Sequence, residues 1–334
     1  LMNKKIAIIG GAGFIGHNLG IYLKNKGAEV FLIDSLSVNN LNSVIDNKDN
    51  LPNPELSQSF LNERLRLIKD NKIKIFIQDA RDYHALSKLL DTIKPNIIIH
   101  LAAVSHSTRS NKDPYSTFDH SFRTLENALD YSKKNVEQFF FFSSSMVYGN
   151  FIEKNVTEKS ICDPIGIYGA LKFSGEKLVI AYNQVFDLPY TIIRPSALYG
   201  ERCISRRVGQ IFIENAIQNK SIVIDGDGSD KLDFTYIDDL MDGVYRAIIS
   251  KNSKNEIFNI THGNGRSIKE LINILEKNFT NIEIKNRERD KLMPERGTLS
   301  IEKAKKLIDY NPEWNLEKGY QRYIDWYKNF SKTS

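Results

Sequence analysis

Tyr168 and Lys172 are the two residues whose types and spacing most clearly suggest chemistry. Residues four apart on a helix share one face, so the phenol and the ammonium would be neighbours. A phenol has a pKa of about 10 and is a weak base at neutral pH, but a nearby positive charge favours the phenolate. The pair predicts a general base for a substrate hydroxyl, with an ordinary helix surface as the alternative interpretation.

Three consecutive serines supply hydroxyl groups that could assist such a base. Ser143, Ser144 and Ser145 directly follow the apolar run at 138–142. Ligands of doubly wound sheets lie beyond the carboxyl ends of the parallel strands. A serine there can hydrogen-bond the reacting hydroxyl and share its proton with a phenolate. A simple turn is the alternative interpretation of the triplet.

A glycine-rich turn follows the first apolar run, with Gly10, Gly13 and Gly16 at its first, fourth and seventh positions. Gly10 would permit the tight turn, Gly13 would let a pyrophosphate approach the backbone, and Gly16 would let a helix pack closely on the strand. That helix would begin near Phe14 and Ile15, where free N–H groups favour a phosphate. The turn predicts a dinucleotide site, although glycines also serve turns that bind nothing.

Acidic residues end the next two apolar runs and indicate which dinucleotide would bind. Asp34 lies about twenty residues beyond the glycine turn, where a carboxylate can accept hydrogen bonds from both hydroxyls of an adenosine ribose. The same carboxylate would repel the extra phosphate of NADP, so the predicted cofactor is NAD. Asp79 and Ala80 end the third run, where a carboxylate can meet the adenine edge. A solvated turn aspartate is an equally good interpretation of Asp79.

Composition excludes several other classes of function. With 334 residues, 41% of them hydrophobic, the chain can bury a sizeable core. It contains no run of about 18 apolar residues that could span a bilayer. Its two cysteines, Cys162 and Cys203, form neither a disulfide framework nor a zinc pattern. The net charge of +5 comes from interspersed charges. We therefore expect a cytoplasmic protein without a membrane, nucleic-acid or metal partner, and an anionic small substrate is compatible with the charge.

Short apolar runs alternate with longer amphipathic stretches over the first 150 residues. This alternation is typical of a parallel sheet wound with helices. The runs are almost continuously apolar, as expected of strands that are covered on both faces. The sequence predicts an α/β fold, a Rossmann-type doubly wound parallel sheet with a smaller C-terminal α/β substrate lobe. The predicted strands cover residues 6–9, 29–33, 74–78, 96–100 and 138–142.

The pattern changes beyond residue 200, where three short predicted helices are separated by turns rich in glycine and aspartate. We assign residues 1–200 to an NAD-binding Rossmann domain, with later sheet segments near 233–262, and residues 201–334 mainly to the substrate lobe. The three short helices are predicted at 206–218, 267–278 and 302–307.

An insertion at 35–71 contains a predicted helix at 56–69 and is interpreted as a surface decoration, an oligomer contact or a lid.

These motifs, in this order and over nearly the whole chain, resemble those of the extended short-chain dehydrogenase family of nucleotide-sugar epimerases and dehydratases. The resemblance implies tightly held NAD, a nucleotide-diphosphate sugar as substrate, and a homodimer or higher homo-oligomer formed through helices near 115–133 and 167–182. It rests on the glycine turn, His100-Leu101-Ala102-Ala103, residues 143–149, the pair Tyr168 and Lys172, and the stretch from Arg194-Pro195 to Tyr199-Gly200.

The resemblance also assigns roles to individual residues. It makes Ser144, Tyr168 and Lys172 catalytic, with Tyr168 as the base and Lys172 orienting the cofactor ribose and lowering the tyrosine pKa. Ser145 would face the sugar, and the backbone at 194–197 would lie near nicotinamide and substrate. The implied cofactor contacts are Gly10, Gly13, Phe14, Ile15, Gly16, Asp34, Asp79, Ala80, Leu101, Ala102, Ala103, Tyr168 and Lys172.

The residue after Ser145 bears on which reaction is catalysed. Sugar 4,6-dehydratases of the family usually carry an acidic residue there, whereas this chain has Met146, and a thioether cannot exchange a proton. A nucleotide-sugar 4-epimerase is therefore the leading prediction. The stretch 104–110 is nevertheless similar to dehydratases, and Ser105 and His106 could reach the sugar. A C4 dehydrogenase, a 4,6-dehydratase and a catalytically silent nucleotide-binding protein remain the alternatives.

Several positions depart from the family pattern around the substrate. Leu232 replaces an arginine that normally holds the diphosphate, and Ala197 replaces an asparagine. His120 and Arg123 stand where many members have asparagine and glycine. We predict that Arg206 and Arg296 bind the substrate, with solvated surface charges as the alternative. These two come from a wider set of candidate anchors, Lys231, Arg202, Arg206, Arg207 and Arg296.

Overall fold

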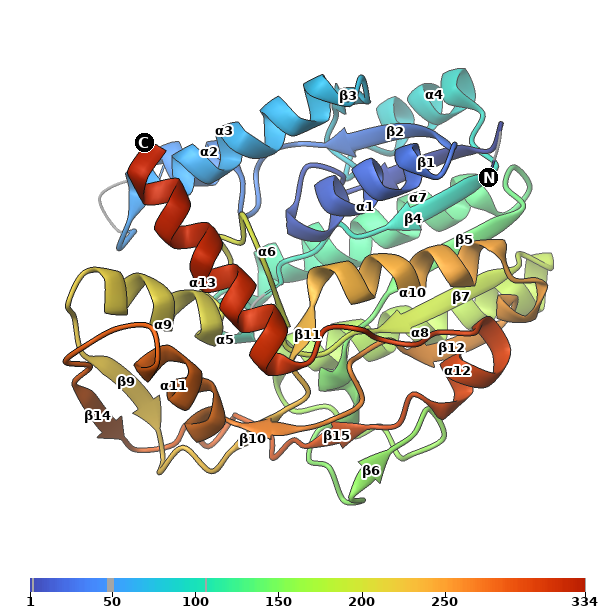
Figure 1. Ribbon diagram of the computed structural model, residues 1–334. Coiled ribbons are helices and arrows are strands. Elements are labelled where there is room, and N and C mark those ends of the chain that lie inside the picture. Colours follow the sequence, from blue (N-terminus) through green and yellow to red (C-terminus); the bar gives the residue numbers. More distant parts are fainter. Residues whose placement is uncertain (2, 47–50, 106, 334) are drawn as a thin grey trace.

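A seven-stranded parallel sheet forms the centre of the protein (Figure 1). The computed structural model describes residues 1, 3–46, 51–105 and 107–333. The strand order is β12-β7-β5-β4-β1-β2-β3, which confirms the predicted doubly wound sheet. The strands are β1 (Lys5–Ile9), β2 (Glu29–Asp34), β3 (Lys74–Ile77), β4 (Ile97–His100), β5 (Gln138–Phe142), β7 (Tyr190–Arg194) and β12 (Glu256–Asn259).

The phenylalanines of β5 explain why its sequence shows no alternation of polar and apolar residues. Successive side chains of a strand point to opposite faces of the sheet. Phe140 and Phe142 pack in the core on one face, and Phe139 and Phe141 pack in the core on the other. Both faces of the central strands are therefore covered, as the apolar runs predict.

Helices cover the two faces in separate groups. On one face, α1 (Phe14–Asn25) and α10 (Ile237–Ile249) pack against each other. On the other, α4 (Tyr83–Ile93), α7 (Thr124–Ser132) and α8 (Gly166–Phe186) pack together. The remaining helical elements of this half are α2 (Leu41–Asp46), α5 (Ser107–Lys112), α6 (Pro114–Phe118), the π-helix Asp119–Arg123 and the 3-10 helix Ser145–Tyr148.

The edge strand β3 departs from the expected continuous burial. Ile77 at its end is 63% exposed, because β3 has a neighbour on one side only and is incompletely covered by helices. The expectation that every apolar run is covered on both faces is wrong for this strand.

From residue 198 on, the chain builds a smaller layer of short strand pairs and helices, to which β6 also contributes a strand, and it returns once to the main sheet through β12. Within the described residues, no helix is long and apolar enough to cross a membrane. The strand pairs are β8 (Leu198–Tyr199) with β11 (Thr235–Tyr236), β9 (Ile222–Asp225) with β14 (Ile284–Arg287), β10 (Lys231–Leu232) with β13 (Arg266–Ser267), and β6 (Asn155–Val156) with β15 (Thr298–Leu299). The helices are α9 (Val208–Ile217), α11 (Ile268–Glu276), α12 (Glu302–Ile308) and α13 (Leu316–Thr333), with a 3-10 turn at Lys251–Ser253.

The insertion between β2 and β3 carries the helix α3 (Pro54–Asp70), which was predicted at 56–69. Figure 1 shows the blue helices α2 and α3 beside the end of the red helix α13. The ring of Phe60 packs on Trp326, Tyr327 and Phe330 of α13, with centroid distances of 4.8, 5.4 and 5.0 Å. One face of α3 thus belongs to the core, and its interpretation as a surface decoration is wrong.

Candidate active site

The glycine turn has the backbone geometry that the sequence predicts for a phosphate site. Gly10 has φ of +84°, and a Cβ atom there would lie 2.7 Å from the Ala102 nitrogen. A Cβ on Gly16 would lie 2.5 Å from the Gly10 oxygen, so the helix can approach only without a side chain. A Cβ on Gly13 would contact only the Gly10 oxygen, at 3.2 Å, which leaves room for a ligand. The free N–H groups of α1 begin just beyond it.

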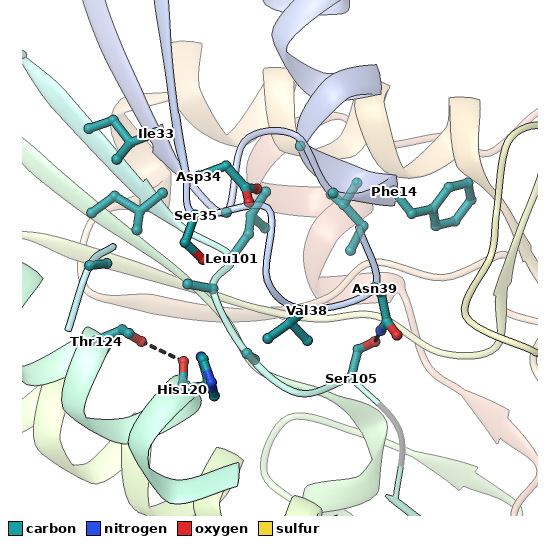
Figure 2. A pocket seen from close by; sticks show the side chains of 18 of the residues that line it. Phe14, Ile33, Asp34, Ser35, Val38, Asn39, Leu101, Ser105, His120 and Thr124 are labelled. Carbon is teal, nitrogen blue, oxygen red and sulfur yellow. Dashed lines mark hydrogen bonds between the residues drawn. The ribbon is translucent and has the colours of Figure 1, made fainter. Parts of the chain in front are cut away.

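Asp34 ends β2 at the wall of a pocket that this turn also lines (Figure 2). Its Oδ2 accepts a hydrogen bond from the Ala12 N–H at 2.9 Å, and its Oδ1 accepts one from the Leu36 N–H at 2.7 Å. Burial raises the pKa of Asp34, and these backbone donors oppose the rise. The carboxylate is held in one orientation, as recognition of a ribose diol requires.

This first pocket collects most of the predicted cofactor contacts. Figure 2 shows Asp34 and Ser35 on one side of it and His120 and Thr124 on another. The turn, the fixed carboxylate and the apolar floor fit an adenine dinucleotide. The predicted residues that line the pocket are Gly10, Gly13, Phe14, Ile15, Gly16, Asp34, Asp79, Ala80, Leu101, Ala102 and Ala103.

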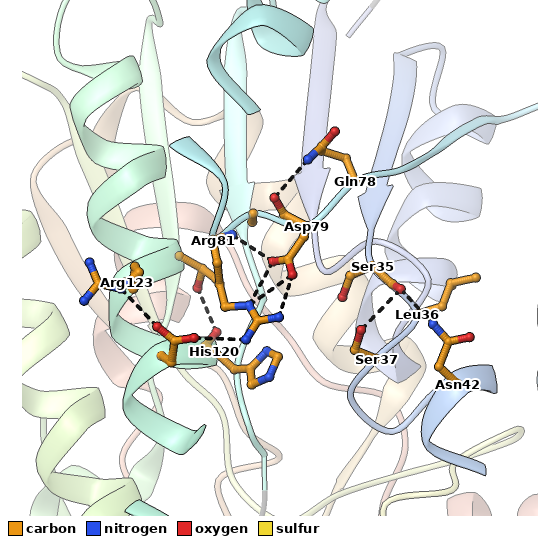
Figure 3. Close-up of polar contacts among 12 residues, drawn as sticks. Ser35, Leu36, Ser37, Asn42, Gln78, Asp79, Arg81, His120 and Arg123 are labelled. Carbon is orange, nitrogen blue, oxygen red and sulfur yellow. Dashed lines mark hydrogen bonds and ion pairs between the residues drawn. The ribbon is translucent and has the colours of Figure 1, made fainter. Parts of the chain in front are cut away.

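The side chain of Asp79 has a partner that the sequence did not predict. Arg81 binds it with an Nη2–Oδ2 distance of 2.7 Å, and Arg81 also contacts Asp119 at 2.9 Å (Figure 3). Burial opposes ionisation of Asp79, but the hydrogen bonds from Arg81 hold its pKa below the usual value. His120, on the π-helix, lies beside this network, and burial and Arg81 lower its pKa. An adenine would meet an ion pair here rather than a free carboxylate.

A second pocket continues from the first, since Ile15, Leu101, Ala103, Ser105 and Arg207 line both. The carboxyl ends of β5 and β7 form one of its walls, as expected for the ligand edge of a parallel sheet. The predicted catalytic and substrate-facing residues on its lining are Ser105, Ser144, Ser145, Tyr168, Lys172, Arg206 and Arg296, together with Met146, Pro195, Ser196, Ala197 and Leu232.

Tyr168 and Lys172 lie one turn apart on α8, with the Lys172 Nζ atom 6.0 Å from the tyrosine ring centroid. Lys172 donates a hydrogen bond to the Phe142 carbonyl at 2.7 Å, and burial lowers its pKa to about 8. Burial raises the pKa of Tyr168, whereas Arg207 and a hydrogen bond with Ser144 oppose the rise. Arg207 and Ser144 thus favour the phenolate in this structure, and the effect of Lys172 on the tyrosine pKa stays a prediction.

The three serines have different surroundings. Ser143 donates from Oγ to Glu176 Oε1 at 2.5 Å, and Glu176 is bound by Arg194 through distances of 2.8 and 2.6 Å. The hydroxyl of Ser143 is thus engaged by this buried ion pair, although Ser143 also lines the second pocket. Ser144 accepts a hydrogen bond from the Met146 N–H at 3.2 Å and faces the pocket. Ser145 also lines the pocket, and its N–H binds the Pro195 carbonyl at 2.9 Å.

The predicted substrate arginines differ in how freely they face the pocket. Arg206 is engaged by Glu214, with an Nη1–Oε2 distance of 2.8 Å. In contrast, the buried Nε atoms of Arg207 and Arg296 have no hydrogen-bond partner among the described residues. Buried donors normally have partners, so these two are better placed than Arg206 to meet an anion. Sequence position alone did not separate Arg207 from its neighbour.

The other positions predicted to contact the substrate lie in different parts of the structure. Ser105 accepts a hydrogen bond from Asn39 Nδ2 at 3.0 Å, at the junction of the two pockets. His106 lies outside the described residues. Arg202 is turned toward helix α1, where its Nε donates to His17 Nε2 at 3.0 Å, and Lys231 is exposed. No group of three or more potential metal ligands occurs among the described side chains.

The sheet, the glycine turn and the Tyr–Lys–Ser group at the strand ends define an NAD-dependent enzyme of the short-chain dehydrogenase type. More narrowly, the chain belongs to the NAD-dependent epimerase/dehydratase family, whose profile matches residues 6–261. The predicted family, α/β fold and NAD cofactor are thereby confirmed.

Relatives of known name cover almost the entire chain. A Methanocaldococcus jannaschii protein, provisionally named a UDP-glucose 4-epimerase, is 31% identical over 98% of this chain and 100% of its own. A UDP-glucuronate 4-epimerase of Thermodesulfobacterium geofontis is 29% identical over 96% and 95%. The UDP-glucuronic acid 4-epimerase of Bacillus cereus, solved in complex with UDP-glucuronic acid and NAD, matches with a TM-score of 0.85 and 28% identity, covering 98% of this chain and 99% of that one.

Proposed function

We propose that this enzyme is a nucleotide-sugar 4-epimerase that acts on a UDP-sugar. The observation that carries the proposal is the grouping of Ser144, Met146 and Tyr168 on one pocket wall. Tyr168 and Ser144 supply the proton-transfer groups that oxidation of a hydroxyl needs. Met146 supplies none at the position where the family's dehydratases carry an acid. The names of the relatives also support a 4-epimerase and uridine diphosphate as the nucleotide part of the substrate.

Bound NAD supplies reversible redox chemistry, the oxidation of a carbinol carbon to a ketone and its reduction back. Tyr168 takes the proton of the C4 hydroxyl, and Ser144 holds that hydroxyl by a hydrogen bond. Lys172, fixed on the Phe142 carbonyl, orients the nicotinamide ribose. Tyr168 returns the proton when the ketone is reduced. Reduction from the opposite face of the sugar ring gives the epimer.

Two arginines support the proposal that the substrate is a sugar carried on a diphosphate. Arg207 and Arg296 come from separate segments of the second half of the chain and line the same pocket. An arginine binds a phosphate through two parallel hydrogen bonds, and two of them would hold a diphosphate at one end of the pocket. The sugar would then extend toward Tyr168.

The proposal is tested by incubating purified enzyme with UDP-glucose, UDP-glucuronate and matched GDP- and dTDP-sugars while following absorbance at 340 nm and product mass. An isomeric product without lasting NADH supports a 4-epimerase. Accumulating NADH with a product two mass units lighter would identify a dehydrogenase, and loss of water would identify a dehydratase. No turnover of any sugar nucleotide, with NAD bound, would favour a catalytically silent protein.

A further inference from the structure

Helix α3 carries a positive charge into the interior of the molecule. Arg64 is only 1% exposed, although it lies on the helix inserted between β2 and β3. Its side chain lines the first pocket together with Asp34 and Gly13. The neighbouring Arg66 lies on the outer face of the helix, with 57% of its side chain exposed. The inserted helix therefore supplies part of the cofactor pocket as well as packing against α13.

The guanidinium of Arg64 connects two segments that are far apart in the sequence. Its Nε and Nη2 atoms donate to the Arg202 carbonyl at 3.1 and 2.5 Å. Its Nη1 atom donates to the Ala12 carbonyl at 3.4 Å. Ala12 belongs to the glycine turn, and Arg202 begins the segment that presents Ser205 and Arg207 to the pocket. One side chain thus ties the phosphate turn to the segment that faces the substrate.

No carboxylate forms an ion pair with Arg64 among the described residues, and its acceptors are neutral carbonyls. Burial, followed by repulsion from Arg202, lowers the pKa of Arg64 to about 10, while Cys203 and Asp34 oppose the change. Arg202 is also bound by neutral groups, on His17 and Asn18. Asp34 attracts Arg64 without forming an ion pair, and burying a cation that has no ion-pair partner costs several kcal/mol. The N-terminus of α1 adds positive potential at the same place.

We propose that Arg64 is an anchoring residue for NAD, whose diphosphate supplies the anion that this buried charge lacks. The tether between Ala12 and Arg202 adds a second effect, because it fixes the glycine turn relative to the segment that carries Arg207. Cofactor and substrate groups are then positioned together. This inference rests on NAD dependence alone and holds whichever sugar reaction the enzyme catalyses.

The test compares Arg64→Met, Arg64→Gln and Arg64→Lys with Arg66→Met as the matched control. We would measure the NAD released on denaturation, the Kd of NAD by calorimetry after removal of bound nucleotide, and the rise in Tm that NAD produces. The uncharged variants should bind NAD at least tenfold more weakly and gain less Tm from it. Arg64→Lys should bind NAD more tightly than the uncharged variants but more weakly than the wild type, because it keeps the charge and loses the fork of donors to Ala12 and Arg202. Arg66→Met should match the wild type.

A purely structural Arg64 predicts a different pattern. The uncharged variants would then lose the same Tm with and without NAD and would keep the wild-type Kd, which would overturn the proposal. Equal Kd values for Arg64→Gln and Arg64→Lys would also overturn it, since the charge would then play no part. If Arg64→Met fails to fold, the comparison of glutamine with lysine decides the question. If the proposal for Arg64 fails, the proposed epimerase function is not affected, because the sugar-nucleotide assay tests it separately.

Discussion

Arg207 and Arg296 face the same pocket with Nε atoms that have no hydrogen-bond partner in the described part of the chain, and Arg207 contributes, after burial, to lowering the pKa of Arg296 to about 10. Two like charges held together in a buried site raise the free energy of the protein unless an anion lies between them. Asp230, which opposes the lowered pKa of Arg296, is itself bound to Arg289 with an Nε–Oδ2 distance of 2.9 Å. The arrangement suits a dianionic ligand.

Replacing either Arg207 or Arg296 by methionine should therefore raise KM for the sugar nucleotide. A hydrogen bond to a charged group contributes about 1.5–3 kcal/mol, which corresponds to roughly tenfold to a hundredfold in affinity. The value of kcat should change much less, because the diphosphate is remote from the reacting carbon. Steady-state kinetics with the preferred UDP-sugar would measure both constants.

Arg206→Met is the matched control, because Arg206 is already engaged by Glu214. Its KM should stay within about threefold of the wild type, since its charge is already paired with the Glu214 carboxylate. Comparable increases in KM for Arg206→Met and Arg207→Met would show that the segment as a whole, and not the free Arg207 donors, binds the substrate.

Tyr168→Phe and Ser144→Ala test the proton transfer. Positioned acid–base groups contribute about 10²–10⁴-fold to the rate, so Tyr168→Phe should lower kcat by that range while NAD content and Tm stay near wild type. Ser144→Ala should lower kcat less, because a hydroxyl that only holds the substrate is more easily replaced by water. Unchanged turnover of Tyr168→Phe would remove the tyrosine from the mechanism.

The sequence predicted the sheet and the cofactor pocket well because both depend on local patterns. Apolar runs identify the buried strands, and a glycine turn followed by Asp34 is contained within one βαβ unit. The boundaries of the strands lie within a residue or two of the predicted limits. For example, β4 begins at Ile97 rather than at residue 96.

What the sequence missed depends on contacts between distant segments. Asp79 was predicted to meet the adenine edge or to be a solvated turn residue, and the ion pair that Arg81 forms with Asp79 and with Asp119 of the π-helix was not predicted. Nothing in the spacing of Arg206 and Arg207 tells which side chain meets Glu214. No prediction covered Arg64, because its buried position depends on contacts with Ala12 and Arg202, which lie 52 and 138 residues away in the chain.

Arg194→Met should destabilise the fold strongly. It would leave Glu176 as a buried carboxylate without its cation, and breaking such a pair costs about 3–5 kcal/mol. The free energy of unfolding, measured by urea denaturation, should fall by that amount. The exposed pair of Lys4 and Glu137 provides the control, because Lys4→Met should cost at most about 1 kcal/mol. Equal losses of unfolding free energy for Arg194→Met and Lys4→Met would contradict the argument that burial makes the Arg194–Glu176 pair important.

Lys172→Met should abolish turnover and yet stabilise the nucleotide-free protein at neutral pH. The lysine pKa is about 8 in the fold and 10.5 as the ordinary value. The unfolded chain therefore binds more protons between these values, and stability rises with pH in that window. The difference corresponds to a cost of roughly 3 kcal/mol at pH 7. Loss of the ammonium's hydrogen bond to the Phe142 carbonyl offsets about 1.5–3 kcal/mol of the gain, the range for a charged donor.

The expected net stabilisation of Lys172→Met is thus about 1 kcal/mol at pH 7, and it should nearly vanish by pH 10, where the buried lysine of the wild type is neutral. Urea denaturation at both pH values, after removal of bound nucleotide, would measure the difference. Lys177→Met is the control on the same helix, because Lys177 is exposed and its removal should give no comparable pH-dependent change. A Lys172→Met variant that is less stable than the wild type at pH 7 would mean that the hydrogen bond to Phe142 outweighs the cost of burying the charge, so that Lys172 stabilises the fold as well as the reaction.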